Sequence, residues 1–316
     1  MADNALPLVL ITNTVPPEHL APLDGVARVL MGPTGGDLMP RAEVLKLAPT
    51  LAGIISQAEL RVDAELLDLA PRLRVVANVA IGVDNLDLPL LRRRGIVATN
   101  VPNAFVDSTA DCTLGLILAA ARRLVEADRF VRAERWRSFQ PGTWDGTLLA
   151  GKTLGLVGYG KIGQAVERRA RAFGLDVIHF RRSDTSAPGY RPLSELLAAS
   201  DFVSLHAPLN PDSNRLINAD RLRQMKRGSF LINMARGRVV DEGALVAALQ
   251  SGQLAGAALD VFEDEPRVHP ALLTMPNVVL SPHLGGGTHE SRRQARHLSA
   301  ANVAAVLLGR PALTPL

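Results

Sequence analysis

Short apolar runs alternate with amphipathic, helix-like stretches along almost the whole chain, and this alternation constrains the fold more than any other feature. Strand-like runs lie over residues 8–11, 26–30, 52–55, 74–77 and 95–99. The alternation restarts after Gly151, with strand-like runs over 153–157, 177–180, 202–205, 229–233, 255–259 and 278–280. Such alternation is typical of βαβ units with parallel strands. We therefore predict an α/β fold with two doubly wound parallel sheets.

The segment between the two alternating blocks has a different composition. Residues 103–136 contain no proline and a single glycine, Gly115, so we expect one or two long helices there. Another helix is expected over residues 290–308. This order predicts a larger domain, residues 101–285, inserted into a smaller domain formed by residues 1–100. Residues 286–316 are expected to return to the smaller domain as a C-terminal helix.

The composition excludes several classes of function. The longest uninterrupted apolar stretch, residues 114–121, has eight residues, whereas a membrane span needs about 18. The N-terminus has no basic head before an apolar run, so we expect a cytoplasmic protein. A single cysteine, Cys112, excludes an internal disulfide and a cysteine-built metal site, and no metal is expected. Scattered arginines, 4% aromatic residues and the lack of a reading motif predict no nucleic-acid partner.

A glycine-rich loop follows the first strand of the larger domain. Its sequence, Gly158-Tyr159-Gly160-Lys161-Ile162-Gly163, matches G-x-G-x-x-G between an expected strand and a helix expected over 161–172. The first glycine permits a tight turn, the second lets the backbone approach a pyrophosphate, and the third lets helix and strand pack closely. The helix N-terminus offers free N–H groups to the phosphates. The motif therefore predicts a Rossmann-type dinucleotide-binding domain.

The end of the next strand indicates which dinucleotide is bound. NAD-binding domains usually carry a carboxylate there, which accepts hydrogen bonds from the ribose 2′-OH. Here the strand is followed by Arg181, Arg182 and Ser183. Because a guanidinium fork matches a phosphate, we predict a preference for NADP(H) over NAD(H). The alternative is that both arginines are ordinary surface residues.

Polar residues follow three later strands of the same domain. They lie in the segments 233–238, 260–266 and 281–286. Ligands of open parallel sheets bind outside the carboxyl ends of the strands, so all three segments are expected to face the cofactor. A cation, carboxylates and an imidazole beside a nicotinamide are suited to the reduction of a carbonyl group.

Taken in order, these stretches resemble the D-isomer-specific 2-hydroxyacid dehydrogenase family. The resemblance extends over nearly the whole chain, and the ordered set of motifs is more specific than any one of them. The matching stretches are the glycine loop, His206-Ala207-Pro208-Leu209, Asn233-Met234-Ala235-Arg236-Gly237, Leu259-Asp260-Val261-Phe262-Glu263-Asp264-Glu265-Pro266 and Ser281-Pro282-His283. The resemblance implies a Rossmann domain inserted into a smaller flavodoxin-like substrate domain. It also implies that the catalytic residues are Arg236, Glu265 and His283.

The chemistry of these three side chains suits that role. Arg236 can bind the carboxylate of a 2-oxoacid and polarise its carbonyl group. His283 can donate a proton to the carbonyl oxygen as hydride arrives. Glu265 can orient the imidazole and favour its protonated form. The alternatives are that His283 is an ordinary loop histidine, that Arg236 is a surface ion-pair partner, or that Glu263 is the partner of the histidine.

The resemblance implies further contacts and a homodimer. Ile81 and Gly82 are expected to bind the substrate carboxylate through backbone N–H groups, together with Arg236 and His283. The dimer contact is expected over residues 103–150, where Trp136 or Trp144 either lines a neighbouring subunit's pocket or packs in the interface. Besides the glycine loop and the segment 181–183, the implied cofactor contacts are Thr109, His206, Ala235, Asp260 and Gly285.

Two departures from the family pattern are present. The frequent Pro-Gly after the crossover strand is Pro102-Asn103 here, and Arg181 replaces the cofactor carboxylate. The expected function is NADPH-dependent reduction of a small 2-oxoacid, glyoxylate or hydroxypyruvate, to the D-2-hydroxyacid. The alternatives are a 2-ketogluconate reductase of the same family and a non-catalytic, dinucleotide-sensing scaffold.

Overall fold

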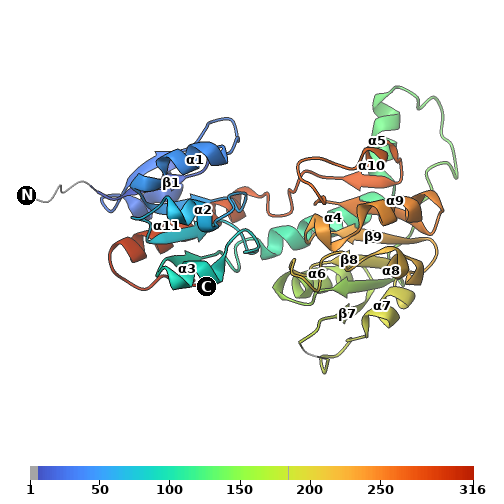
Figure 1. Cartoon of the computed structure of the whole chain (residues 1–316). Helices are drawn as coiled ribbons and strands as arrows, with labels where there is room; N and C mark the ends of the chain where they lie inside the picture. The colour runs from blue at the N-terminus through green and yellow to red at the C-terminus, as the bar shows by residue number, and fades with distance from the viewer. Residues whose placement is uncertain (1–5, 184) are drawn as a thin grey trace, which may run out of the picture. The chain divides into compact units, whose positions relative to one another are not determined.

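The computed structural model describes residues 6–183 and 185–316, and it divides into two compact units (Figure 1). Unit 1 comprises the chain up to Phe105 together with Thr288–Leu316, and unit 2 comprises Val106–Gly287. The chain therefore passes from unit 1 into unit 2 after Phe105 and returns to unit 1 at Thr288. Among the described residues, none of the helices combines the length and the apolar character that a membrane span requires.

Unit 1 contains a five-stranded parallel sheet in the order β2-β1-β3-β4-β5. This is the strand order of flavodoxin-like, doubly wound folds, as predicted. Its strands are β1 (Leu8–Ile11), β2 (Arg28–Met31), β3 (Leu51–Ser56), β4 (Val75–Asn78) and β5 (Val97–Thr99). Its helices are η1 (Pro17–Leu23), α1 (Arg41–Leu47), η2 (Ala48–Thr50), α2 (Ala64–Asp68), α3 (Leu88–Arg93) and α11 (His289–Leu307).

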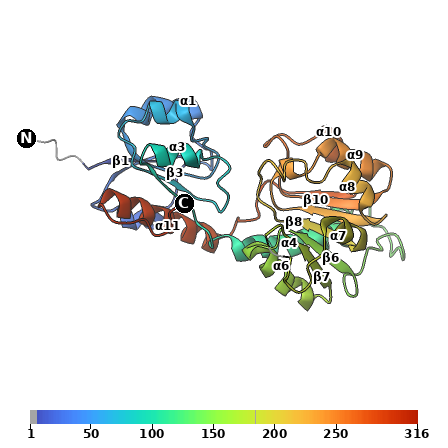
Figure 2. The same cartoon turned by 60° about the horizontal axis from the view of Figure 1, so that its bottom comes forward.

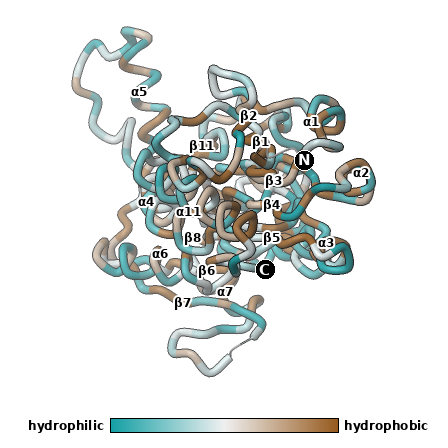
Figure 3. The backbone as a smooth tube through the Cα atoms, turned by 90° about the vertical axis from the view of Figure 1, so that its left-hand side faces the viewer, coloured by the Kyte–Doolittle hydropathy of each residue, from teal (hydrophilic) through white to brown (hydrophobic). Residues whose placement is uncertain are grey.

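The strands of unit 1 are apolar because helices cover both faces of the sheet. Every residue of β3 and β4 is buried, as expected for parallel strands between two helical layers. Helices α1, α2 and α3 pack on one face, and η1 and α11 pack on the other (Figure 2). In Figure 3, which colours the backbone by hydropathy, the hydrophobic strands are brown and the connections between them are largely teal, which marks hydrophilic residues.

Unit 2 contains a six-stranded parallel sheet in the order β11-β10-β9-β8-β6-β7. The chain runs from β6 outward to β7 and then crosses back to β8 on the other side of β6, so the winding reverses beside β6. Ligands of doubly wound folds bind at such a point. The strands are β6 (Thr153–Val157), β7 (Asp176–Phe180), β8 (Phe202–Leu205), β9 (Ser229–Asn233), β10 (Leu254–Leu259) and β11 (Val278–Leu280).

Helices also cover both faces of this sheet. The core on one face includes residues of α4 and α6, and the core on the other includes residues of α7, α8, α9 and α10 (Figure 2). The expected helical segment over 103–136 forms two helices, α4 and α5. The helices of unit 2 are α4 (Val106–Ala121), α5 (Leu124–Arg132), α6 (Lys161–Ala172), α7 (Leu193–Ala199), α8 (Ala219–Gln224), η3 (Gly237–Val239), α9 (Glu242–Gln250) and α10 (Pro270–Thr274).

Several helices start directly after a capping side chain. Asp63 precedes α2, Asp241 precedes α9 and Thr288 precedes α11, and each side chain accepts a hydrogen bond from a backbone N–H of the first turn. These caps satisfy N–H groups that have no partner within the helix.

Parallel pairing places the carboxyl ends of all six strands of unit 2 at one edge, and the loops that follow them gather there.

Candidate active site

The glycine loop between β6 and α6 has the geometry that a pyrophosphate requires. Gly158 has a φ of +101°, and a Cβ there would lie 2.6 Å from the backbone nitrogen of Ala207, so only glycine fits. A Cβ on Gly163 would lie 2.5 Å from the carbonyl oxygen of Gly158. A Cβ on Gly160 would meet only open space, directly before the N-terminus of α6. That space, bordered by helical N–H groups, fits the pyrophosphate of a dinucleotide.

The arginines expected to select the dinucleotide follow β7. Arg182 forms an ion pair with Asp212 and donates to the side-chain oxygen of Asn210 at 3.4 Å. Both partners belong to the loop after β8, and no motif in the sequence pointed to either. Arg181 is half-buried and Arg182 is exposed. The two arginines therefore have different surroundings, and Arg182 already has an anionic partner.

Tyr159 closes the side of the glycine loop next to β7. Its ring stacks on His179 with the ring centroids 3.6 Å apart, and its hydroxyl donates to Glu167. Burial and the neighbouring Glu167 raise the pKa of Tyr159 to about 12. Tyr159 therefore remains a neutral phenol at physiological pH, and its ring lines the glycine loop on the side of β7.

The ends of β10 and β11 bring Glu265 and His283 together. His283 Nδ1 donates to Oε2 of Glu265 at 2.8 Å, and Oε1 of Glu265 accepts the N–H of Phe262 at 3.0 Å. Glu263 contacts other groups, because Arg215 donates to its carboxylate at 2.8 Å. Of the two candidate partners of the histidine, the structure therefore selects Glu265. The bond at Nδ1 leaves Nε2 as the nitrogen that can exchange a proton with a ligand.

The third predicted catalytic residue lies close to this pair. Burial raises the pKa of Glu265, but the hydrogen bond and charge of His283, the N–H of Phe262 and the charge of Arg236 together lower it below its ordinary value. Arg236 follows β9, and its Nη1 donates to the carbonyl of Ala235 at 2.8 Å. A Cβ on Gly237 would lie 1.8 Å from the carbonyl carbon of Phe262. Only glycine therefore allows the segment of Arg236 to approach that of Glu265 so closely.

Asp260 holds the loop that carries His283. The Asp260 side chain is buried, and its Oδ1 accepts the hydroxyl of Ser281 at 2.6 Å and the N–H of Leu284 at 2.8 Å. Its Oδ2 accepts the N–H of Gly285 at 2.8 Å. His283 has a φ of +52°, a left-handed conformation that costs about 1–3 kcal/mol and persists only where the surroundings impose it. The bonds to Asp260 supply that constraint.

The remaining predicted cofactor residues of unit 2 lie at the same edge of the sheet. A Cβ on Gly285 would lie 3.6 Å from the side chain of Thr109, so α4 and this loop meet there. Ala235 N donates to the side chain of Asn233 at 3.1 Å. His206 follows β8, and its Nε2 lies 2.9 Å from the hydroxyl of Ser204. Burial lowers the pKa of His206 to about 4.

Unit 1 carries a separate candidate site in the loop after β4. Three successive carbonyl groups there accept hydrogen bonds: that of Ala80 from Val101 N at 3.1 Å, that of Ile81 from Asn100 Nδ2 at 2.9 Å and that of Gly82 from Asn78 Nδ2 at 2.8 Å. Because N–H and C=O point in opposite directions across a trans peptide, the N–H groups of residues 81, 82 and 83 point away from these partners. None of the three N–H groups donates to another group among the described residues.

Consecutive free N–H groups can donate hydrogen bonds to the same anion. Ile81 and Gly82 were predicted to bind a carboxylate, and their geometry is suited to that. Asn100, which orients one of the peptides, was not predicted. A half-buried side-chain amide 19 residues downstream leaves no recognisable pattern in the sequence.

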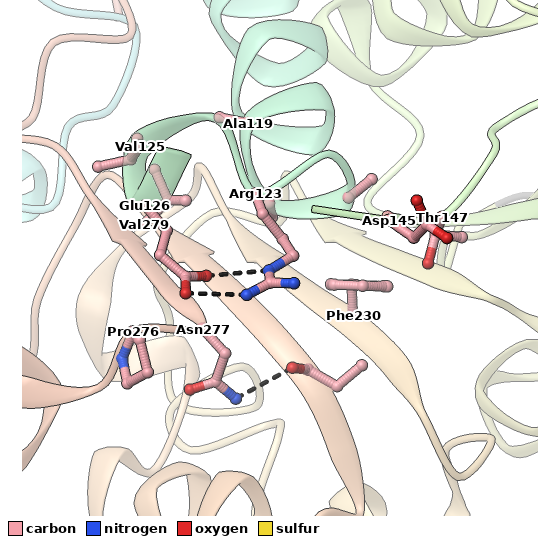
Figure 4. Close-up of a pocket in the computed structure, with 14 residues that line it drawn as sticks. Ala119, Arg123, Val125, Glu126, Asp145, Thr147, Phe230, Pro276, Asn277 and Val279 are labelled. Atoms are coloured by element: carbon pink, nitrogen blue, oxygen red, sulfur yellow. Dashed lines mark hydrogen bonds and ion pairs between the residues drawn. The ribbon is translucent and has the colours of Figure 1, made fainter. Parts of the chain in front are cut away.

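A cavity of unit 2 lies at the other edge of the sheet. It has a volume of about 450 Å³ and is lined by the amino ends of the strands, including Phe230, Ala255 and Asn277, together with Arg123 and Glu126 of α5 and its start (Figure 4). Arg123 and Glu126 form a two-pronged ion pair at 2.9 and 3.0 Å. The glycine loop and His283 are at the carboxyl ends of the strands, so we do not assign this cavity to the dinucleotide.

The two tryptophans have different surroundings. Trp144 packs against Phe130, with ring centroids 4.9 Å apart, and the guanidinium of Arg123 lies 5.1 Å from its ring. Trp136 has 60% of its surface exposed. Of the two, Trp136 is therefore the one whose ring is available for an intermolecular contact.

Comparison with known proteins identifies a matching family and similar enzymes. Residues 114–285 match the NAD binding domain of the D-isomer specific 2-hydroxyacid dehydrogenases. The chain is 42% identical over 309 residues to the glyoxylate reductase of Thermococcus kodakarensis, covering 95% of this chain and 92% of that protein. It is 40% identical over 313 residues to the glyoxylate reductase of Pyrococcus furiosus, covering 96% and 93%.

Solved structures extend the likeness to the whole fold. A protein from Thermus thermophilus superposes with a TM-score of 0.93 at 43% identity, covering 98% of this chain and 99% of that one. The NADPH-dependent glyoxylate/hydroxypyruvate reductase of Sinorhizobium meliloti, solved with NADP and malonate, superposes with a TM-score of 0.87 at 34% identity, covering 99% and 97%. The chain therefore belongs to the D-isomer-specific 2-hydroxyacid dehydrogenases, oxidoreductases that reduce 2-oxoacids with a nicotinamide dinucleotide.

Proposed function

We propose that this chain reduces glyoxylate or hydroxypyruvate to the D-2-hydroxyacid with NADPH. The observation that carries the proposal is the 2.8 Å hydrogen bond from His283 to Glu265, with the charge of Arg236 close enough to act on the same carboxylate. Together they supply a proton donor, a group that orients it and a cation for the substrate. The names of the similar reductases from Thermococcus kodakarensis and Sinorhizobium meliloti support the choice of substrate.

The mechanism assigns one task to each of these side chains. NADPH, when bound, supplies the hydride that adds to the carbonyl carbon of the substrate. His283 donates its Nε2 proton to the carbonyl oxygen, which takes the electron pair of the C=O bond and becomes a hydroxyl group. Glu265 stays a carboxylate throughout and holds the Nδ1–H of the imidazole. His283 is then reprotonated from solvent.

The substrate carboxylate and the cofactor are assigned to further groups. Arg236 and the backbone N–H groups of Ile81 and Gly82 bind the carboxylate. The glycine loop binds the pyrophosphate, with contacts from Thr109, His206, Ala235, Asp260 and Gly285. The 2′-phosphate is bound by Arg181, with Arg182 and Ser183.

A panel of substrates and cofactors tests the proposal. We expect kcat/KM to be highest for glyoxylate or hydroxypyruvate, and at least tenfold higher with NADPH than with NADH. A higher kcat/KM for 2-ketogluconate would identify the alternative reductase. Binding of NADPH without turnover of any 2-oxoacid would identify the dinucleotide-sensing scaffold.

The role of Arg181 is tested separately. Arg181→Ala should lower kcat/KM with NADPH at least tenfold and change it less than threefold with NADH, because only NADPH carries the 2′-phosphate. Arg191→Ala is the matched control, since this exposed arginine donates to the neighbouring carbonyl of Tyr190. Equal losses with both cofactors would refute the role of Arg181.

We also propose a homodimer formed over residues 103–150. Large apolar side chains are exposed along this segment, among them Trp136 at 60% and Phe139 at 83%. Contiguous exposed apolar residues of this size typically mark a protein–protein contact.

A further inference from the structure

A cluster of basic side chains lies on unit 1, where α11 packs against η1. It comprises His19 of η1 and Arg292, Arg293, Arg296 and His297 of α11, and we refer to it as the basic cluster. Arg292 and Arg296 are four residues apart, as are Arg293 and His297, so each pair lies on one side of the helix. None of the five residues belongs to the site proposed above.

Within the described part of the chain, the arginines of the basic cluster have no carboxylate partner. Arginines elsewhere on unit 1 form ion pairs, for example Arg41 with Asp63 and Arg94 with Asp68. Among the residues that the structure describes, no carboxylate lies within ion-pair distance of Arg292, Arg293 or Arg296. Among the described residues, the acidic group that raises the pKa of His19 is Glu18, which precedes it.

Two nitrogen atoms of the basic cluster are buried and have no hydrogen-bond partner among the residues that the structure describes. They are Nδ1 of His19 and Nε of Arg296, and both residues are half-buried. Buried polar atoms in folded proteins almost always have a partner, and an exception requires an explanation. The two unpaired nitrogens therefore mark the basic cluster as a place where a hydrogen-bonding partner is missing.

The electrostatics of the basic cluster are unfavourable in the absence of an anion. Burial lowers the pKa of His19, and the charges of Arg296, Arg293 and His297 lower it further, which places all three close to the imidazole. Burial and the charge of Arg292 lower the pKa of Arg296. Arg292 also lies in the first turn of α11, where the helix dipole disfavours cations and favours anions.

We propose that the basic cluster binds a small phosphate group, either inorganic phosphate or the phosphate of a small monoester. A doubly charged oxyanion offsets several cations at once, and its oxygens accept the forked hydrogen bonds that guanidinium groups donate. A second binding site for an anionic metabolite is thereby assigned to unit 1, and it requires neither the dinucleotide nor the 2-oxoacid.

Thermal melting of the full chain in inorganic phosphate tests this site. Phosphate is raised to about 20 mM while sodium chloride keeps the ionic strength constant, and glycerol phosphate replaces it in a second arm. The wild-type Tm should rise saturably by roughly 2–4 °C. A larger rise with glycerol phosphate would assign the site to phosphate monoesters, and an equal or smaller rise would assign it to phosphate itself.

Variants test whether the rise in Tm comes from phosphate bound at the basic cluster. Arg296→Met and His19→Gln should abolish the rise and weaken phosphate binding at least tenfold by isothermal titration calorimetry. Arg92→Met, which removes an exposed arginine of α3 on the same unit, should retain both. In phosphate-free buffer, Arg296→Met should melt no lower than the wild type, because the substitution removes a repelled, partly buried cation.

Three outcomes would overturn the proposal. The first is a wild-type Tm that phosphate changes no more than chloride does. The second is a full rise in Arg296→Met, which would place the phosphate elsewhere, for example at the arginines after β7. The third is a fall of more than about 2 °C for Arg296→Met in phosphate-free buffer, which would show that this charge is already compensated within the protein.

Discussion

Glu263 and Glu265 are two residues apart, yet their side chains contact different partners. Glu265 accepts the Nδ1–H of His283, whereas Glu263 pairs with Arg215. Glu265→Gln should lower kcat about 10–100-fold, because the carboxylate that accepts the Nδ1–H of His283 and orients the imidazole is lost. Steady-state kinetics would measure this effect.

Glu263→Gln is the matched control for this prediction. It removes an equal charge from the same loop without touching the imidazole, so kcat should stay within threefold of the wild type. If both variants lost activity equally, the loss would come from a disturbed loop, and the positioning role of Glu265 would have to be abandoned.

His206 makes stability dependent on pH. Its pKa is about 4 in the folded chain and 6.5 in the unfolded chain, because burial disfavours the charged imidazole. Between these values the unfolded state binds more protons, so the free energy of unfolding falls as the pH drops from 6.5 toward 4. For this half-buried group we expect a loss of about 1–2 kcal/mol at pH 4.5.

Urea denaturation at pH 7.5 and 4.5 would measure this loss. His206→Asn should lose about 1–2 kcal/mol less between the two pH values than the wild type, because the variant has no group to protonate there. His289→Asn, at an exposed position at the start of α11, should keep the wild-type difference. An unchanged difference in His206→Asn would contradict the assignment.

The loop after β4 acts as one element because side chains orient its successive peptides. Asn100 holds the carbonyl of Ile81 and thereby directs the N–H of Gly82. Asn100→Ala should raise KM for the 2-oxoacid at least tenfold while the Kd for NADPH stays unchanged, since the glycine loop belongs to the other unit. Steady-state kinetics and fluorescence titration with NADPH would separate the two effects.

Asn277→Ala is the control, because this asparagine also donates to a backbone carbonyl, that of Ala255, but at the amino end of β10. It should leave both constants unchanged. A loss of NADPH affinity in Asn100→Ala would show that the substitution disturbs more than the substrate loop.

At the level of elements, local patterns predicted position and type well. Helix α6 runs over Lys161–Ala172, as the glycine motif predicted. The second strand was expected over 26–30 and lies over Arg28–Met31. Its ends are set by parallel pairing with β1, in which Leu8 faces Arg28. Pairing partners are not encoded in the local pattern, so strand ends could not be predicted to the residue.

For the whole molecule, the exposed apolar side chains over 103–150 lead to a prediction about assembly. Trp136→Ser combined with Phe139→Ser should raise the dissociation constant of the proposed dimer at least tenfold, because large aromatic side chains dominate such contacts. Size-exclusion chromatography with light scattering at several concentrations would measure it. Leu273→Ser, which removes a side chain of α10 that is 60% exposed, should leave the dimer intact. A double variant with unchanged mass would place the interface elsewhere.

The sequence by itself determined the two parallel sheets, the glycine loop and the motifs of the family, because these depend on spacing along the chain. Hydrophobic periodicity reports which side chains are buried, and glycine reports where the backbone turns or approaches closely. The tertiary structure alone decided which side chains meet: Glu265 rather than Glu263 at His283, Asp212 at Arg182, and Asn100 at the loop after β4. The physical reason is that these contacts join residues 18 to 30 positions apart, and only the order and pairing of the strands bring them within hydrogen-bonding distance.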